Sequence, residues 1–254
     1  ARVADVPGLL ERLAPPHPLM PVLAADRRPL VELIGLLRKI GAACDVPTRP
    51  SLLAQLLQRD RALIDDDVVL ANLVTMLWDG RNMLQTLLLW LSKRAAQHPG
   101  QLERIRASGH DPAAAESLAR AFVLEVLRLD VSRYIYRQVA SEFRIRAWRL
   151  PAGWLLRICQ HEMHTSAACF EQPREFNPER FPGGRYDSGW FWPFSRGVHR
   201  CFAEHFVMWV GAQFVQALAS FDVQLRADGP DERINRHWAF PRPSREFRVE
   251  LRRI

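Results

Sequence analysis

Apolar residues recur at helical spacing along most of the chain, and this pattern predicts five main helices. The expected helices cover residues 30–43, 51–57, 65–96, 112–129 and 201–220. The longest, 65–96, begins with three consecutive aspartates, which suit the positive end of a helix dipole, and the dipeptide His98-Pro99 ends it. Ser51 is the expected N-cap of the second helix.

Two parts of the chain alternate between apolar and polar residues instead, and this alternation predicts strands. Phe143–Trp148 and Trp154–Ile158 flank Pro151-Ala-Gly153, an arrangement typical of a hairpin with a Pro/Gly turn. The tail from Val223 to Ile254 alternates as well. Residues 1–29 hold six prolines and are expected to form an irregular entry segment. The predicted fold class is therefore mainly α with a minor antiparallel β part.

Composition supports a folded chain with a sizeable core, because 48% of its 254 residues are apolar and 25% are charged. The net charge of +7 comes from scattered arginines, which favours a solvated face over a nucleic-acid site, and no nucleic-acid-binding motif is recognised. No apolar run reaches the ~18 residues that span a bilayer, and no signal-like segment is present. We therefore expect no membrane span and a cytoplasmic protein.

The four cysteines lie far apart and form no CxxC pair, so they indicate neither a zinc site nor a disulfide scaffold. Cys201 differs from the others because it follows a glycine-containing loop and stands just before an apolar helix. A helix N-terminus lowers the pKa of a thiol, and free backbone amides there can point at the sulfur. Burial as a small apolar side chain is the commoner fate of an isolated cysteine. The residues around Cys201 decide between these two interpretations.

The segment Phe194-Ser-Arg-Gly197-Val-His199-Arg-Cys201-Phe-Ala203 resembles the heme-binding loop of cytochromes P-450 at every position of the family pattern. The resemblance implies heme b (iron protoporphyrin IX) as the cofactor and Cys201 as the proximal iron ligand. An axial thiolate pushes electron density onto the iron and favours O–O cleavage. It further implies that Phe194 packs beside the sulfur, Gly197 permits the tight loop, His199 binds a heme propionate and Ala203 fills the last place of the motif.

Three further motifs of this family occur in the expected order. Glu125-Val-Leu-Arg128 matches the ExxR motif of the K helix, here 112–129, and Pro178-Glu-Arg180-Phe181 matches the PERF segment. The resemblance implies a buried network of Glu125, Arg128 and Arg180 behind the heme. Arg137 stands where the family often has a second propionate-binding arginine. Taken alone, the Glu125–Arg128 spacing is that of an ordinary i,i+3 helix pair.

The helix 65–96 takes the place of the family's I helix, which crosses the distal face of the heme. In that alignment the family's proton-relay motif becomes Asp79-Gly80-Arg81-Asn82-Met83. Gly80 is retained, whereas Asn82 replaces the acid and Met83 the threonine. Methionine has no exchangeable proton, and an amide is a poor relay at neutral pH.

Three interpretations of this departure stay open. The protein uses dioxygen through water or substrate groups; it uses a peroxide or rearranges its substrate, with Asn82 and Arg81 gripping that substrate; or it is a non-catalytic subunit that stabilises or recruits a partner enzyme. The leading interpretation is a heme-thiolate oxidoreductase acting on a small organic molecule. The cationic residues Arg196 and Arg200 near the loop suit an acidic electron donor such as a ferredoxin.

The resemblance covers residues 30–254, the C-terminal heme-binding part of a P-450 fold, whereas the family's large N-terminal portion is missing. That portion normally covers one face of the heme, so we expect a large exposed apolar surface in its absence. We therefore expect a complement, which is a further part of the same polypeptide, a separate N-terminal chain or a second copy in an oligomer.

Overall fold

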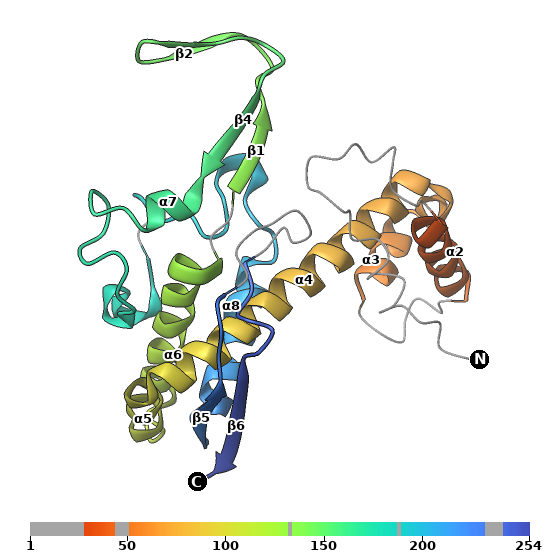
Figure 1. Cartoon of the computed structure of the whole chain (residues 1–254). Helices are drawn as coiled ribbons and strands as arrows, with labels where there is room; N and C mark the ends of the chain where they lie inside the picture. Colours follow the sequence, from red (N-terminus) through yellow and green to blue (C-terminus); the bar gives the residue numbers. More distant parts are fainter. Residues whose placement is uncertain (1–27, 44–50, 132–133, 187–188, 232–240) are drawn as a thin grey trace. The chain divides into compact units, whose positions relative to one another are not determined.

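Helices make up most of the described part of the chain, and three small antiparallel sheets of two strands each accompany them (Figure 1). The computed structural model describes residues 28–43, 51–131, 134–186, 189–231 and 241–254. The described part of the chain divides into two compact units, one made of residues 28–43 and 51–83, the other of residues 84–131, 134–186, 189–231 and 241–254. The predicted fold class, mainly α with minor antiparallel β, is confirmed.

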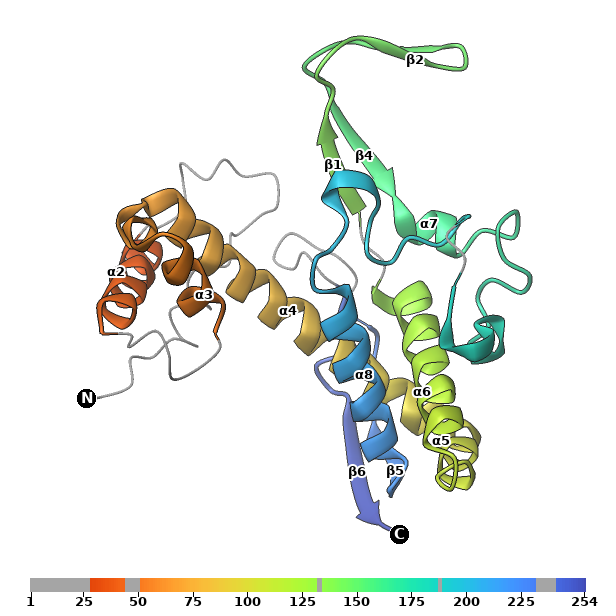
Figure 2. The same cartoon turned by 180° about the vertical axis from the view of Figure 1, so that it is seen from behind.

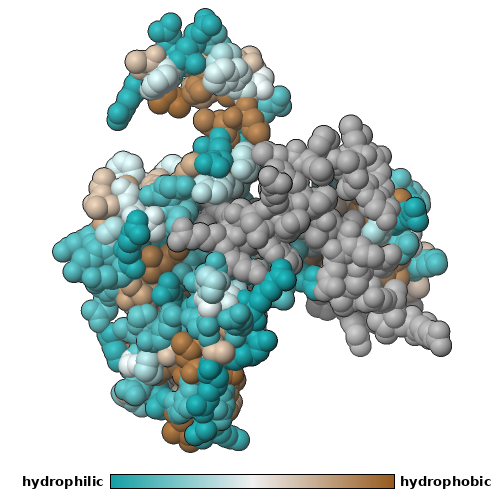
Figure 3. Space-filling view, in the orientation of Figure 1, coloured by the Kyte–Doolittle hydropathy of each residue, from teal (hydrophilic) through white to brown (hydrophobic). Residues whose placement is uncertain are grey.

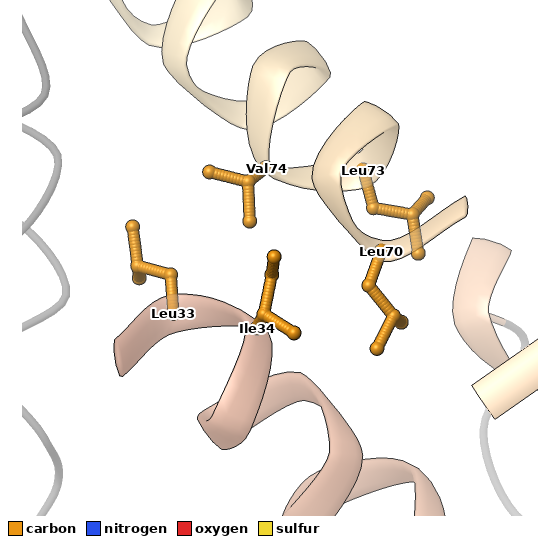
Figure 4. Packing of buried hydrophobic residues seen from close by; sticks show 5 residues of the cluster. All are labelled: Leu33, Ile34, Leu70, Leu73 and Val74. Carbon is orange, nitrogen blue, oxygen red and sulfur yellow. The ribbon is translucent and has the colours of Figure 1, made fainter. Parts of the chain in front are cut away.

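The first unit packs helix α2 (Arg28–Ala42) against the beginning of helix α4 (Asp67–Gln97), with helix α3 (Leu52–Arg59) beside them. Helical spacing gathers the apolar residues of α2 and α4 on facing sides. Figure 4 shows the resulting core, made of Leu33, Ile34, Leu70, Leu73 and Val74.

Two predictions at the start of this unit are tested. Ser51 is the N-cap of α3, as predicted, because its hydroxyl accepts a hydrogen bond of 3.1 Å from the amide of Ala54. The expected entry segment 1–29 lies outside the described residues up to residue 27. Arg28 and Pro29 already belong to α2, where a proline in the first turn forgoes no helical hydrogen bond.

Helix α4 begins two residues later than predicted, at Asp67, because residues Arg61–Asp65 form a separate 3₁₀ turn. Asp66 caps α4, and its carboxylate accepts hydrogen bonds of 2.8 Å and 3.2 Å from the next free amides. The helix ends at Gln97, as His98-Pro99 indicated. Pro99 also opens helix α5 (Pro99–Ala107), which the sequence analysis did not predict.

In the second unit, helix α6 (Pro112–Val126) lies beside helix α8 (Glu204–Leu218), as both cartoon views show (Figures 1 and 2). Gly211 permits this close approach, since a Cβ there would lie 3.0 Å from a methyl group of Val123. Helix α6 stops at Val126 instead of residue 129, and a buried π-helical turn, Leu127–Val131, follows it.

The predicted hairpin between Phe143–Trp148 and Trp154–Ile158 is wrong in its pairing. Strand β2 (Phe143–Ile145) pairs with β3 (Trp148–Leu150), and β4 (Leu155–Cys159) pairs with β1 (Tyr134–Gln138). The β2–β3 turn includes Arg146 at φ +52°, a left-handed conformation that the sequence did not signal. Pro151–Gly153 instead lead from β3 back to the β1–β4 ladder, where the amide of Gly153 donates to the carbonyl of Val139 at 2.8 Å.

The remaining elements complete the second unit. Helix α7 (Gln160–His164) follows β4, and 3₁₀ turns occur at Pro178–Arg180, Pro182–Gly184 and Gly197–His199. The tail forms β5 (Phe221–Ala227) and β6 (Arg248–Arg253), which pair antiparallel, in agreement with the predicted strands. Lys93 of α4 anchors the segment after β5 through ion pairs of 2.8 Å with Asp228 and 2.6 Å with Asp231. No helix among the described residues has the length and apolar character needed to cross a membrane.

Candidate functional site

The loop before α8 folds back on itself and presents Cys201 at its end. The amide of Cys201 donates to the carbonyl of Phe194 at 2.8 Å, and the amide of Arg200 donates to that of Gly197 at 3.0 Å. Gly197 has φ +64°, a left-handed conformation that favours glycine. The side chain of Phe194, the first residue of the loop, is buried, so this end of the loop is anchored in the core.

Cys201 is a free, half-buried thiol two residues before the Ala203 N-cap of α8. Ala203 offers no side chain to cap the helix, so the first amides of α8 have no side-chain partner there. Such amides stabilise a thiolate. Within the described ranges, no group of three or more His, Cys, Asp or Glu side chains could hold a bare metal ion. One thiol fits a metal that brings its other ligands with a cofactor, as the iron of a porphyrin does.

The two residues predicted to bind heme propionates, His199 and Arg137, lie on different elements. His199 is exposed on the 3₁₀ turn next to Val198, of which 97% is exposed. Arg137 is half-buried on β1 opposite Leu156, and its guanidinium donates to the carbonyl of Tyr136 at 2.8 Å. Loop and strand both belong to the second unit.

The structure brings Glu125, Arg128 and Arg180 together at the end of α6. Arg128 binds the carboxylate of Glu125 through two hydrogen bonds of 2.7 Å and 2.8 Å, and both side chains are fully buried. Arg180 lies 3.4 Å from the same carboxylate, which also accepts from the amide of Asn177 at 2.8 Å. An ion pair this deep is held by its many partners, since isolated burial of either charge would be costly.

Arg128 also joins three distant carbonyl groups. Its guanidinium donates to the carbonyls of His164 at 2.7 Å, Pro173 at 2.6 Å and Glu175 at 3.1 Å. It further lies over the ring of Phe170. One buried side chain therefore holds the irregular segment after α7 against α6.

His164 is a buried imidazole that the sequence analysis did not single out. Its Nε2 accepts a hydrogen bond of 3.0 Å from the amide of Trp192. Burial, together with the charge of Arg128, lowers the pKa of His164 to about 3, so the ring is neutral at neutral pH and can accept this bond. His164 thereby positions the residues that lead into the loop.

A second missed feature is a network around Glu204, the first residue of α8. Arg200 donates to both oxygens of this carboxylate, at 2.8 Å and 3.0 Å, and the hydroxyl of Tyr186 donates at 3.0 Å. The hydrogen bond from Arg200 holds the pKa of the Glu204 carboxyl below its usual range. Burial beside that carboxylate raises the pKa of Tyr186 to about 12. The i,i+4 spacing of Arg200 and Glu204 could have signalled the pair.

A cavity of about 560 Å³ adjoins the same loop within the second unit. Its polar lining includes Arg120, Arg185, Arg196, Arg200, Tyr186 and Glu204. Four arginines and one glutamate give this cavity a clear excess of positive charge.

The predicted distal residues Gly80, Arg81, Asn82 and Met83 lie on α4 in the first unit. The side-chain amide of Asn82 donates from Nδ2 to the carbonyl of Trp78 at 2.9 Å, one turn earlier in the same helix. Thr86, one turn after Met83 and within the second unit, is fully buried, and its hydroxyl has no hydrogen-bond partner among the described residues. Thr86 is not among the residues predicted from the sequence, although a threonine on this helix is a signal that could have pointed to it.

Comparison with known proteins places the chain in a family. The family model for cytochrome P-450 matches residues 51–251, and the chain belongs to this family. Cytochrome P-450 137 of Mycobacterium tuberculosis is 29% identical over 190 residues, which cover 74% of this chain and 40% of that protein. Abscisic acid 8'-hydroxylase 3 of Oryza sativa subsp. indica is 26% identical over 158 residues, covering 56% of this chain and 31% of the hydroxylase.

Solved structures show the same fold. Retinoic acid bound cyanobacterial CYP120A1 superimposes with a TM-score of 0.82 at 22% identity, covering all of this chain and 64% of that one. The fold is the C-terminal part of a cytochrome P-450 fold, as predicted. The chain spans less than half the length of the two curated relatives. Heme b is the cofactor of this family, and the single thiol at the end of the loop fits it.

Proposed function

We propose that this chain provides the heme-thiolate part of an oxidoreductase that acts on a small organic molecule, with Cys201 as the axial ligand of the iron. The observation that carries this proposal is the geometry of the loop. The loop turns at Gly197 and closes through the backbone hydrogen bond from the amide of Cys201 to the carbonyl of Phe194. Heme b, when bound, supplies the redox chemistry at its iron. The chain's own residues hold the thiol, exclude water behind it and anchor the propionates.

The other loop and helix residues have supporting roles in this proposal. Phe194 shields the sulfur side of the loop, and Ala203 keeps the helix start free of a competing side chain. His199 and Arg137 bind the propionates. The Glu125–Arg128–Arg180 network keeps the segment before the loop in place through its backbone contacts.

On the distal side, we propose oxidation that draws no proton from residues 82 and 83. The side-chain amide of Asn82 already donates to the carbonyl of Trp78 in its own helix, and the side chain of Met83 has no exchangeable proton. A peroxide brings the protons and electrons that dioxygen would need, so a peroxide-driven reaction or a substrate rearrangement suits this helix. Arg81 and Asn82 would then orient the substrate near Gly80. Turnover with dioxygen would need another proton donor, and the nearest hydroxyl along the helix is the buried one of Thr86.

Turnover of a probe substrate separates the two oxidants. With the chromogenic phenol 2,6-dimethoxyphenol, hydrogen peroxide should drive faster oxidation than dioxygen supplied together with NADPH, ferredoxin and its reductase. Met83→Thr should raise only the reductase-driven rate, by up to about 10²-fold, because it restores a hydroxyl for proton transfer. Met83→Leu is the matched control and should change neither rate. A wild-type protein that prefers the reductase system, with Met83→Thr neutral, would contradict this assignment.

We further propose that the arginine-rich surface around this cavity docks an acidic electron donor such as a ferredoxin. Arg120, Arg185 and Arg196 line the cavity beside the Arg200–Glu204 pair, and we propose that their positive charges meet carboxylates of the partner. Charge complementarity of this kind mainly raises association rates and makes them salt-dependent.

Charge reversal tests the donor site. Arg185→Glu and Arg196→Glu should each slow heme reduction by reduced ferredoxin at low salt, by roughly tenfold, and should flatten its dependence on ionic strength. Reduction by dithionite, a small reagent that needs no docking, should stay unchanged. Equal rates and an unaltered salt dependence in both variants would show that the donor binds elsewhere.

The N-terminal complement is also a proposal. Phe202, Phe206 and Trp209 on the loop and α8 are 75%, 57% and 57% exposed, and Figure 3 shows further apolar surface on the segment that runs from β1 to β4. Apolar exposure on this scale is typical of a surface that a partner covers. We propose that the remaining part of a P-450 fold, in the same polypeptide or in a separate chain, is that partner.

A non-catalytic subunit is the second candidate function, and the altered residues Asn82 and Met83 are the observation that favours it. A subunit that only stabilises or recruits another enzyme has no need of heme, so the heme content of the purified protein distinguishes the two candidates. The cytoplasmic location and the absence of a nucleic-acid partner stay predictions.

A further inference from the structure

The residue before Cys201 and the residue three positions after it are joined directly. Arg200 reaches across the junction between loop and helix and binds both oxygens of Glu204. Two parallel bonds of this kind fix the orientation of the pair as well as its distance. Cys201 lies within the short stretch of chain that this clamp spans.

Glu204 carries its charge in a place where charge needs compensation. Only 12% of its side chain is exposed, whereas 61% of the Arg200 side chain is exposed. Tyr186 donates the third hydrogen bond to the same carboxylate, from the segment that precedes the loop. A carboxylate so enclosed depends on its partners for stabilisation.

The carboxylate also occupies the positive end of α8, which is the feature that would stabilise a thiolate at Cys201. An uncompensated negative charge at this helix end would oppose the gain of an electron by a metal bound to Cys201. Arg200 offsets the charge of Glu204 through its two hydrogen bonds to the carboxylate.

We propose that Arg200, Glu204 and Tyr186 are positioning residues that set the charge beside the Cys201 ligand and so tune the reduction potential of the heme iron. This inference rests on the proposed function, in which Cys201 binds the iron. It assigns a role to Glu204 that the loop motif does not include. The surroundings of a metal ligand commonly control its potential in this way.

The test is the one-electron reduction potential of the heme-loaded full chain, measured by dithionite titration with redox mediators. Glu204→Gln keeps the shape but removes a negative charge and frees Arg200, so the potential should rise. Arg200→Gln leaves the carboxylate uncompensated, so the potential should fall. The double variant Arg200→Gln with Glu204→Gln should return close to the wild-type value, because the two charges cancel.

Matched variants distinguish an effect of charge on the reduction potential from an effect of impaired folding. Arg226→Gln removes the same charge from an ion pair with Glu250 on the β5–β6 sheet and should leave the potential unchanged. Tyr186→Phe keeps the ring and removes one donor, so it should lower the potential by less than Arg200→Gln does. It also serves as the deciding variant if Arg200→Gln fails to retain heme.

Shifts of opposite sign in the two single variants would support the inference. Shifts of the same sign, or no shift, would overturn it, since a merely structural clamp would impair the site equally from either end. If the wild-type protein lacks a thiolate-type spectrum, the proposed function fails instead, before any variant is compared.

Discussion

Replacing Glu125 with alanine is expected to lower the free energy of unfolding by about 3–5 kcal/mol. The substitution leaves the guanidinium of Arg128 fully buried without its carboxylate, and breaking a buried pair from one side exposes the full desolvation cost of the remaining charge. Arg180 loses its ion-pair partner, and the backbone amide of Asn177 loses its acceptor. Urea denaturation of the wild type and the variant, followed by circular dichroism, measures the difference.

The network also predicts that replacing both Glu125 and Arg128 will not restore the stability of the protein. In a simple buried pair, replacing both partners with apolar residues is often neutral. Here a double replacement, Glu125→Leu with Arg128→Met, should remain strongly destabilised, because three carbonyls lose the donor that Arg128 provides.

An exposed ion pair provides the matched control for this prediction. Arg104 and Glu179 lie 2.6 Å apart with 47% and 63% of their side chains exposed, so Arg104→Ala should cost no more than about 1 kcal/mol. A loss below about 1 kcal/mol in Glu125→Ala, or full rescue by the double variant, would mean that the network does not hold this part of the fold together.

The long helices were predictable because their boundaries have local chemical causes. Asp66 caps α4, and His98-Pro99 ends it, so a pattern of apolar residues with these signals located the helix to within two residues. Helix α5 was missed because Pro99 was interpreted only as the end of a helix, although proline is equally suited to the first turn of the next one.

Strand pairing was less predictable than strand position. Alternation of apolar and polar residues identified the stretches around β2 and β4, but it contains no information about which strand lies opposite. The left-handed turn at Arg146, a residue type with no preference for that conformation, allowed β2 and β3 to pair locally, and β4 then paired with β1.

The loop residues and the network of Glu125, Arg128 and Arg180 were predicted from family motifs, and the structure brings both arginines to the Glu125 carboxylate. The other supporting residues of the site needed coordinates. Glu204 escaped notice because an acidic residue in the first turn of a helix is ordinary. His164 escaped because its partner, the amide of Trp192, belongs to an irregular segment.

Loss of the thiolate signature on replacing Cys201 is the second large expected effect. Serine retains the size of the side chain but offers the iron no thiolate, so Cys201→Ser should lose the red-shifted Soret band of the ferrous carbon monoxide complex entirely. Cys159→Ser and Cys169→Ser, which change the other two free cysteines that the structure describes, are the matched controls and should keep that band.

The most direct test of the central claim is therefore the absorption spectrum of the purified, heme-loaded protein, first ferric and then reduced under carbon monoxide, for the wild type and these three variants. We expect a thiolate-type band in the wild type, Cys159→Ser and Cys169→Ser, and its absence in Cys201→Ser alone. A band that survives in Cys201→Ser would contradict the assignment of the ligand. A wild-type protein that takes up no heme would contradict the heme-thiolate function and favour the non-catalytic subunit.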